Sequence, residues 1–272
     1  MRRLSYHLKI LIPALLLLLA VPGGAQSERL IRFGLFPYVD PNTLIQHHRP
    51  LKLYLEQALA RPIVMLTASD FETFMQRTLA GDYDLILSAP HMARHAELAG
   101  GYRRIAMAVH RVQGVILTRR DTGIEQIVDL RGKIIAFAEK QAIINLMALA
   151  ILENYDLHVG QQLQTLDAKT HNNALLAMLH GDADAAIVPI LLWRRLDEAA
   201  KQQLELLEKT PAVPGVMFMT NPRLQTAEME MIRDAILRFA QSSLSKTYFF
   251  PSGFIPITED AMRSLDPYIK SW

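Results

Sequence analysis

The chain has 272 residues, half of them apolar, with 29 basic and 27 acidic side chains and no cysteine. This near-neutral charge gives no basic surface of the kind that binds nucleic acid. The absence of cysteine excludes disulfides, thiol nucleophiles and cysteine-ligated metals. The length suits one large domain or two modest ones.

Residues 1–25 have the pattern of a signal peptide. Basic residues at Arg2, Arg3 and Lys9 precede an apolar run over 10–21, and small residues at 23–25 precede Gln26. The alternative is an uncleaved membrane anchor. The run is shorter than the about 20 residues of a spanning helix, so we expect cleavage and a mature protein outside the cytoplasmic membrane.

Strands and helices alternate after the leader. The helix after the first strand is expected to be capped by Asn42 or Thr43, and its pair His47-His48 to be exposed. A charged surface helix is expected over 193–204. The expected strands are 30–36, 62–66, 85–87, 102–109, 114–118, 133–137, 164–166, 205–208 and 217–220. The main expected helices are 42–60, 70–80, 90–99, 142–154, 170–180, 193–204 and 229–244. This alternation predicts mostly parallel α/β sheets.

One helix–turn–strand unit occurs twice, 100 residues apart. Its first copy begins at Asp70 and turns through Gly81-Asp82-Tyr83-Asp84, and its second begins at Thr170 and turns through Gly181-Asp182-Ala183-Asp184. Each glycine stands where a helix ends in a left-handed residue. The aspartates are interpreted as turn formers rather than catalytic carboxylates, because both units carry them at the same place. The repeat predicts two α/β lobes of similar build.

The order of the elements predicts that the chain crosses between the lobes twice. Lobe 1 is expected to comprise residues 26–109, with 215–272 returning to it, and lobe 2 residues 110–214. The two crossing segments would form a hinge, with a cleft between the lobes. Ligands of open α/β sheets bind at the carboxyl ends of strands, which here are the turns 37–43, 88–91, 138–142 and 168–173.

Seven sequence landmarks, in this order and spacing, resemble a known family: the substrate-binding proteins of phosphate, phosphite and phosphonate ABC transporters, which have the type II periplasmic binding protein fold. The landmarks are Gly34-Leu35-Phe36-Pro37-Tyr38, Arg49-Pro50-Leu51 with Tyr54-Leu55, Gly81-Asp82-Tyr83-Asp84, Asp129-Leu130-Arg131-Gly132-Lys133, His171 with Gly181-Asp182-Ala183-Asp184, Pro211 to Pro214, and Gly253-Phe254-Ile255-Pro256. The resemblance covers essentially all of the mature chain and implies a two-lobed α/β protein.

The resemblance implies that Tyr38 and His171 contact the ligand. A hydroxyl and an imidazole can both donate to an oxyanion, and His171 stands in a first helical turn, whose free amides favour an anion. The candidate set is completed by residues of the same four turns: Ser88, His91, Gln141 and Asn172.

Two departures from the family pattern bear on the ligand. The hydroxyl-rich loop of phosphonate binders is here Ala138-Glu139-Lys140-Gln141-Ala142, and Glu139 would repel a bound dianion. The family's tyrosine after Pro90 is Ala93, which makes His91 a replacement donor. A zwitterionic or weakly anionic ligand fits this altered loop better than phosphonate itself.

We therefore expect a monomeric periplasmic protein that captures a small polar, oxyanionic ligand and delivers it to an ABC permease. An alternative is a ligand sensor that signals to a membrane sensor kinase. An enzyme using the same cleft is the third reading, but no nucleophile and base have supporting spacing, and Ser88 lacks a Gly-x-Ser-x-Gly elbow. No cofactor is expected, and no metal, because His91 and His95 have no acid at a supporting distance.

Overall fold

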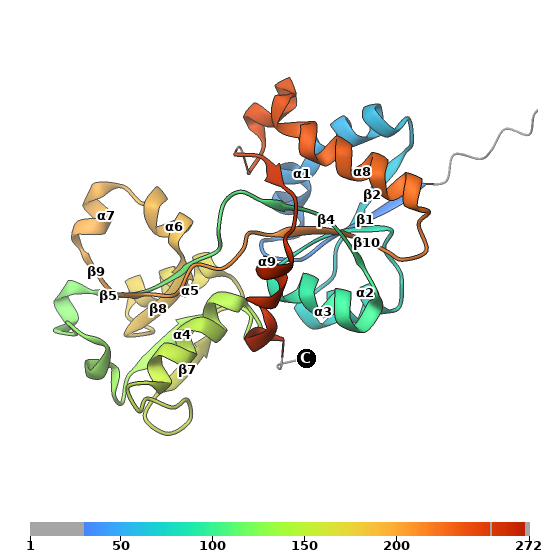
Figure 1. Ribbon diagram of the computed structural model, residues 1–272. Helices are drawn as coiled ribbons and strands as arrows, with labels where there is room; N and C mark the ends of the chain where they lie inside the picture. The colour runs from blue at the N-terminus through green and yellow to red at the C-terminus, as the bar shows by residue number, and fades with distance from the viewer. Residues whose placement is uncertain (1–29, 251, 270–272) are drawn as a thin grey trace, which may run out of the picture.

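A computed structural model describes residues 30–250 and 252–269. Helices and two separate sheets form two lobes joined by extended crossings (Figure 1). The predicted two-lobed α/β architecture is therefore confirmed. The expected signal peptide lies outside the described residues and stays a prediction. None of the helices in the described ranges is long and apolar enough to cross a membrane.

Lobe 1 is built on a six-stranded sheet with the order β11-β4-β10-β3-β1-β2. Strands β1 to β4 run in one direction, and β10 and β11 run against them. In Figure 1, α1 and α8 lie on one side of this sheet and α2 and α3 on the other. The elements are β1 (Ile31–Leu35), α1 (Pro41–Leu59), β2 (Ile63–Leu66), α2 (Phe71–Leu79), β3 (Leu85–Ser88), α3 (Pro90–Gly100), β4 (Arg103–Ala108), β10 (Met217–Thr220), α8 (Thr226–Arg238), β11 (Phe254–Ile255) and α9 (Glu259–Arg263).

Lobe 2 is built on a five-stranded sheet with the order β7-β6-β8-β5-β9, in which only β5 runs against the others. Alternate side chains of β5 point to opposite faces of the sheet. Val115 and Leu117 pack with Leu175 of α5, whereas Ile116 belongs to the main core. The elements are β5 (Gly114–Arg119), β6 (Ile134–Phe137), α4 (Ile143–Glu153), β7 (Gln164–Asp167), α5 (His171–His180), β8 (Ala185–Pro189), α6 (Ile190–Arg195), α7 (Glu198–Gln202) and β9 (Leu204–Lys209).

The repeated aspartates hold equivalent strands together. Asp84 accepts a hydrogen bond from the backbone N–H of Arg32 at 2.9 Å, and Asp184 accepts one from the backbone N–H of Ile134 at 2.8 Å. The backbone N–H of each aspartate donates back to the carbonyl of the same residue, at 2.8 Å in both lobes. For Asp84 and Asp184 the interpretation as turn formers is confirmed, because each carboxylate ties its turn to the neighbouring parallel strand.

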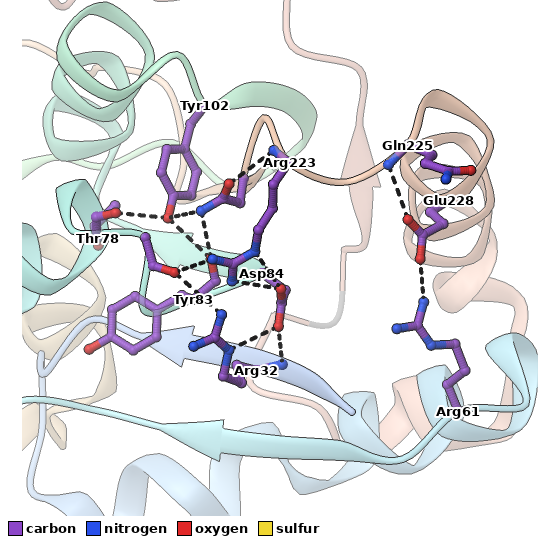
Figure 2. Close-up of polar contacts among 11 residues, drawn as sticks. Arg32, Arg61, Thr78, Tyr83, Asp84, Tyr102, Arg223, Gln225 and Glu228 are labelled. Atoms are coloured by element: carbon purple, nitrogen blue, oxygen red, sulfur yellow. Dashed lines mark hydrogen bonds and ion pairs between the residues drawn. The ribbon is translucent and has the colours of Figure 1, made fainter. Parts of the chain in front are cut away.

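Polar contacts fix the returning segment of the chain to lobe 1. Figure 2 shows Arg223, which follows β10, reaching Asp84 with its Nη2 atom at 2.7 Å, while Arg32 approaches the same carboxylate from β1. The same view shows Arg61, at the end of α1, paired with Glu228 of α8 at 2.7 Å. The segment after the second crossing therefore belongs to the first sheet by side-chain contacts as well as by strand pairing.

The two crossings between the lobes run side by side. Val112 and Val213 exchange backbone hydrogen bonds of 3.0 and 2.9 Å, and Ala108 N–H donates to Val216 at 2.9 Å. A Cβ atom at Gly215 would lie 2.3 Å from the carbonyl oxygen of His110, so only glycine allows the strands this close approach. The hinge is thus a paired ribbon rather than two independent linkers.

Candidate ligand-binding site

A cavity of about 710 Å³ lies between the lobes, and its walls come from both of them. All four turns at the carboxyl ends of strands contribute, through Tyr38, Ala89, Ala142 and Thr170 among others. The remaining walls come from the crossings, α6 and the segment after α8. The lining residues outside the four turns are Phe36, His47, Phe71, His110 to Gln113, Ile143, Ile144, Pro189 to Leu192, Arg195, Val216, Phe249 and Phe250.

Several helices begin at this cavity, among them α3, α4 and α5. Helices α3 and α4 start after Ala89 and Ala142, and neither has a side-chain cap. Helix α5 starts after Thr170, whose hydroxyl accepts from the N–H of Asn173 at 3.1 Å, as predicted. First-turn amides have no carbonyl partner within their helix, and the helix dipole makes this end positive. The converging helix ends therefore favour a negatively charged ligand.

His171 and Asn172 form the first turn of α5 and line the cavity. The Nδ1 atom of His171 is buried and has no hydrogen-bond partner among the described residues. Burial lowers the pKa of His171 to about 4, so the imidazole is neutral at neutral pH. A neutral imidazole has one donor nitrogen and one acceptor nitrogen. A ligand can therefore form a hydrogen bond with His171 whichever of the two nitrogens faces the cavity.

Tyr38 lines the opposite side of the cavity and belongs to a buried polar network. Its hydroxyl lies 3.1 Å from Nε2 of His48, whose Nδ1 atom lies 2.9 Å from the hydroxyl of Tyr248. Burial raises the pKa values of both tyrosines well above their usual value and lowers that of His48 to about 3. The network is therefore neutral, and Tyr38 presents a protonated hydroxyl group to a ligand.

The expectation that His47 and His48 form an exposed pair is wrong. His48 is fully buried, and His47 lines the cavity with its ring stacked on Phe249 at a centroid distance of 4.6 Å. A sequence signal for His48 exists, because its position continues the apolar face of Leu44 and Leu51 at helical spacing. The cap of this helix is also Asp40, which accepts from the Thr43 N–H at 3.0 Å, rather than Asn42 or Thr43.

The other three candidate residues, Ser88, His91 and Gln141, are not part of the cavity lining. Ser88 is fully buried, and its hydroxyl oxygen has no hydrogen-bond partner within the described part of the chain. His91 is fully buried as well, and its Nε2 atom lies 2.8 Å from the carbonyl oxygen of Gln141. That contact joins α3 of lobe 1 to the loop before α4 of lobe 2. His91 and Gln141 therefore lie at a contact between the lobes, outside the cavity lining.

Arg195 and His110 are among the cavity residues that were not anticipated from the sequence. The expected surface helix over 193–204 is split, because α6 ends at Arg195 and Asp197 caps α7, and Arg195 lines the cavity with its guanidinium 5.0 Å from the ring centroid of Phe249. His110 also lines it. Burial, together with Arg194 and Arg195, lowers the pKa of this histidine.

Acidic groups near the cavity are few. Asp40 is the carboxylate in the lining, and the Thr43 amide holds its pKa below the usual value. Glu139 is not part of the lining, and burial and the carboxylates of Asp167 and Asp70 raise its pKa. Within the described residues, no group of three or more histidines and carboxylates is arranged to hold a metal ion.

The fold is shared with solved structures of low sequence identity. PhnD1 from Prochlorococcus marinus, solved with methylphosphonate, superposes with a TM-score of 0.79 at 13% identity, over 90% of this chain and 98% of that one. The binding protein component of an ABC phosphonate transporter from Pseudomonas aeruginosa gives 0.78 at 16% identity, over 90% and 87%. A Xanthomonas citri protein solved with ATP gives 0.74 at 17% identity, over 89% and 97%.

A family model identifies the chain itself. The model, described as "ABC transporter, phosphonate, periplasmic substrate-binding protein", matches residues 33–262. This match spans both lobes, both crossings and the cavity between them. The resemblance drawn from the seven landmarks is therefore confirmed. The chain belongs to the family of periplasmic substrate-binding proteins of phosphonate ABC transporters.

Proposed function

We propose that this protein captures an oxyanionic, phosphonate-like ligand in the cavity between its lobes and delivers it to an ABC permease. The observation that carries the ligand assignment is the meeting of the amino-termini of α3, α4 and α5 at one cavity that is also lined by His171, whose Nδ1 atom is buried and unpaired among the described residues. These groups supply donors and positive potential without a hydroxyl-rich loop.

The ligand would act by joining the lobes. The amino-terminus of α3 belongs to lobe 1, and those of α4 and α5 belong to lobe 2, so an anion held between these helix ends would contact both lobes. Because such a ligand has more contacts in the closed form, it shifts the population toward closure. We place the moving units at residues 26–109 with 215–272 and at 110–214, after removal of residues 1–25, and the permease would recognise the closed monomer.

The proposal is supported by the relative from Prochlorococcus marinus, which was solved with methylphosphonate. Methylphosphonate is therefore the first probe for isothermal titration calorimetry on the protein from Gln26 onward. We expect binding, and we expect His171→Ala to weaken it by roughly 1.5–3 kcal/mol, the range for a hydrogen bond to a charged group.

The matched control is His180→Ala, at the exposed opposite end of the same helix, which should leave the affinity unchanged. Circular dichroism would verify that both variants fold. Absence of binding by methylphosphonate, inorganic phosphate and phenylphosphonate would overturn the oxyanion assignment. Equal affinities of the wild type and His171→Ala would remove His171 from the site.

A further inference from the structure

The lobe 1 side of the cavity is a continuous aromatic wall. Its ring centroids are spaced by 5.8 Å from Phe71 to Phe36, 4.9 Å from Phe36 to Tyr38, 5.9 Å from Tyr38 to Phe249 and 4.9 Å from Phe249 to Phe250. All five residues line the cavity. Rings at these spacings form a rigid apolar surface that contributes large contact area with little loss of side-chain entropy.

The lobe 2 side presents branched aliphatic side chains. Ile143 and Ile144 come from the first turn of α4, and Ile190 opens α6. These three isoleucines are buried, and Leu191 and Leu192 are half-buried beside them. The cavity therefore has two apolar walls that face each other across the lobe boundary, and the polar groups occupy the helix ends between them.

The volume of the cavity and the charged groups in its lining restrict the class of ligand further. A volume of about 710 Å³ falls in the range of roughly 300–1,000 Å³ of sites that enclose a whole organic ligand. Arg111 and Arg195 are the cations of the lining, and the carboxylate of Asp40 is already engaged as the α1 cap. A ligand ammonium group would meet apolar walls and two guanidinium groups, and Asp40, with one oxygen engaged in the cap, is the single carboxylate among the described lining residues that could offset them, which is unfavourable.

We infer that the preferred ligand is an organophosphonate with an aromatic substituent and no amino group. Its oxyanion faces the first turns of α3, α4 and α5, and its ring lies between the aromatic wall and the aliphatic wall. This inference rests on the proposed function and adds the substrate class to it.

The test compares three phosphonates that differ in the substituent alone: methylphosphonate, phenylphosphonate and 2-aminoethylphosphonate. Calorimetry on the protein from Gln26 onward, at fixed pH and salt, gives the three affinities. Burial of a phenyl group in place of a methyl group should tighten binding about tenfold to hundredfold. The aminoethyl compound should bind more weakly than methylphosphonate.

Two variants test whether the phenyl substituent lies between the aromatic wall and the aliphatic wall. Phe249→Ala and Leu192→Ala each remove apolar contact from one wall, so each should reduce the ratio of phenylphosphonate to methylphosphonate affinity at least threefold. Leu176→Ala, an exposed position on α5 outside the lining, is the control and should leave this ratio unchanged. His171→Ala should weaken both compounds and leave the ratio near the wild-type value.

The outcomes separate the two proposals. Methylphosphonate or 2-aminoethylphosphonate binding as tightly as phenylphosphonate would overturn the inference and leave the oxyanion assignment intact. A preference for phenylphosphonate that survives both wall variants would overturn the placement of the ring. If none of the three phosphonates binds, the inference fails, and the proposed function fails with it when inorganic phosphate does not bind either.

Discussion

The Nε2 atom of His91 in lobe 1 lies 2.8 Å from the carbonyl oxygen of Gln141 in lobe 2. A carbonyl oxygen accepts only, so the His91 nitrogen carries the proton and donates. Burial lowers the pKa of His91 to about 4, which keeps the ring neutral. The structure thus contains a hydrogen bond between the lobes, beside the cavity, that does not depend on a ligand.

Replacing His91 should therefore loosen the closed form. A net hydrogen bond contributes about 0.5–1.5 kcal/mol, so His91→Ala should shift the closed-to-open ratio by roughly two- to thirteenfold toward the open form. Small-angle X-ray scattering of the unliganded protein should report a larger radius of gyration, and phosphonate affinity should fall by a similar factor.

His91→Gln provides the matched control, because its amide can still donate to Gln141. It should restore part of the lost affinity, whereas a purely structural role of the ring would make both variants equally unstable. An unchanged radius of gyration in His91→Ala, with the fold intact, would show that this contact does not influence closure.

Local chemistry made much of the fold predictable. Thr170 caps its helix and Gly181 ends it in a left-handed residue, both as the repeat predicted, because these effects act within a single turn. The paired aspartates were recognisable because two copies could be compared. Loop geometry also located the cavity, since ligand sites in such sheets follow the carboxyl ends of strands.

Long-range packing explains what the sequence did not reveal. His48 is buried because Tyr38 and Tyr248 approach it from segments 10 and 200 residues away. Arg195 reaches the cavity because α6 ends before Asp197, a break that the charged run did not indicate. His91 was expected to meet the ligand, and its burial against lobe 2 depends on how the lobes approach each other.

The two repeated aspartates predict unequal mutational effects. In Asp84→Asn, a carboxylate whose side chain is 3% exposed loses its charge beside Arg32 and Arg223. Burial alone would raise the pKa of Asp84, but the Arg32 amide and the two guanidinium groups hold it below the usual value. We expect a loss of about 2–3 kcal/mol, below the full cost of a broken buried pair because both arginines are partly exposed.

Asp184→Asn is the internal control at the equivalent turn. Its side chain is 31% exposed, and its cation, Lys133, is 4.0 Å away and 40% exposed. We expect a loss of about 0–1 kcal/mol by urea denaturation. Equal losses in the two variants would show that the backbone contacts common to both aspartates, rather than the arginine pairs, account for their contribution to stability.

Buried histidines should make the fold sensitive to mild acid. Burial lowers the pKa of His48 to about 3 and those of His91 and His171 to about 4, from 6.5 in the unfolded chain. Between these values the unfolded state binds more protons than the folded state, so the free energy of unfolding falls as the pH falls from about 6.5 to 4. Above about pH 7 these histidines are neutral in both states, so they do not change the free energy of unfolding with pH.

Urea denaturation at pH 7.5 and 5.5 measures this dependence. Each of the three histidines should lower the free energy of unfolding by about 1.3 kcal/mol between these two pH values, or about 4 kcal/mol together. His171→Asn removes one titrating group at a first-turn position where asparagine is tolerated, so its loss between the two pH values should be smaller by about 1.3 kcal/mol. A wild-type loss below about 1 kcal/mol would mean that these rings become protonated in the folded protein, which would require the cavity and the lobe interface to admit water.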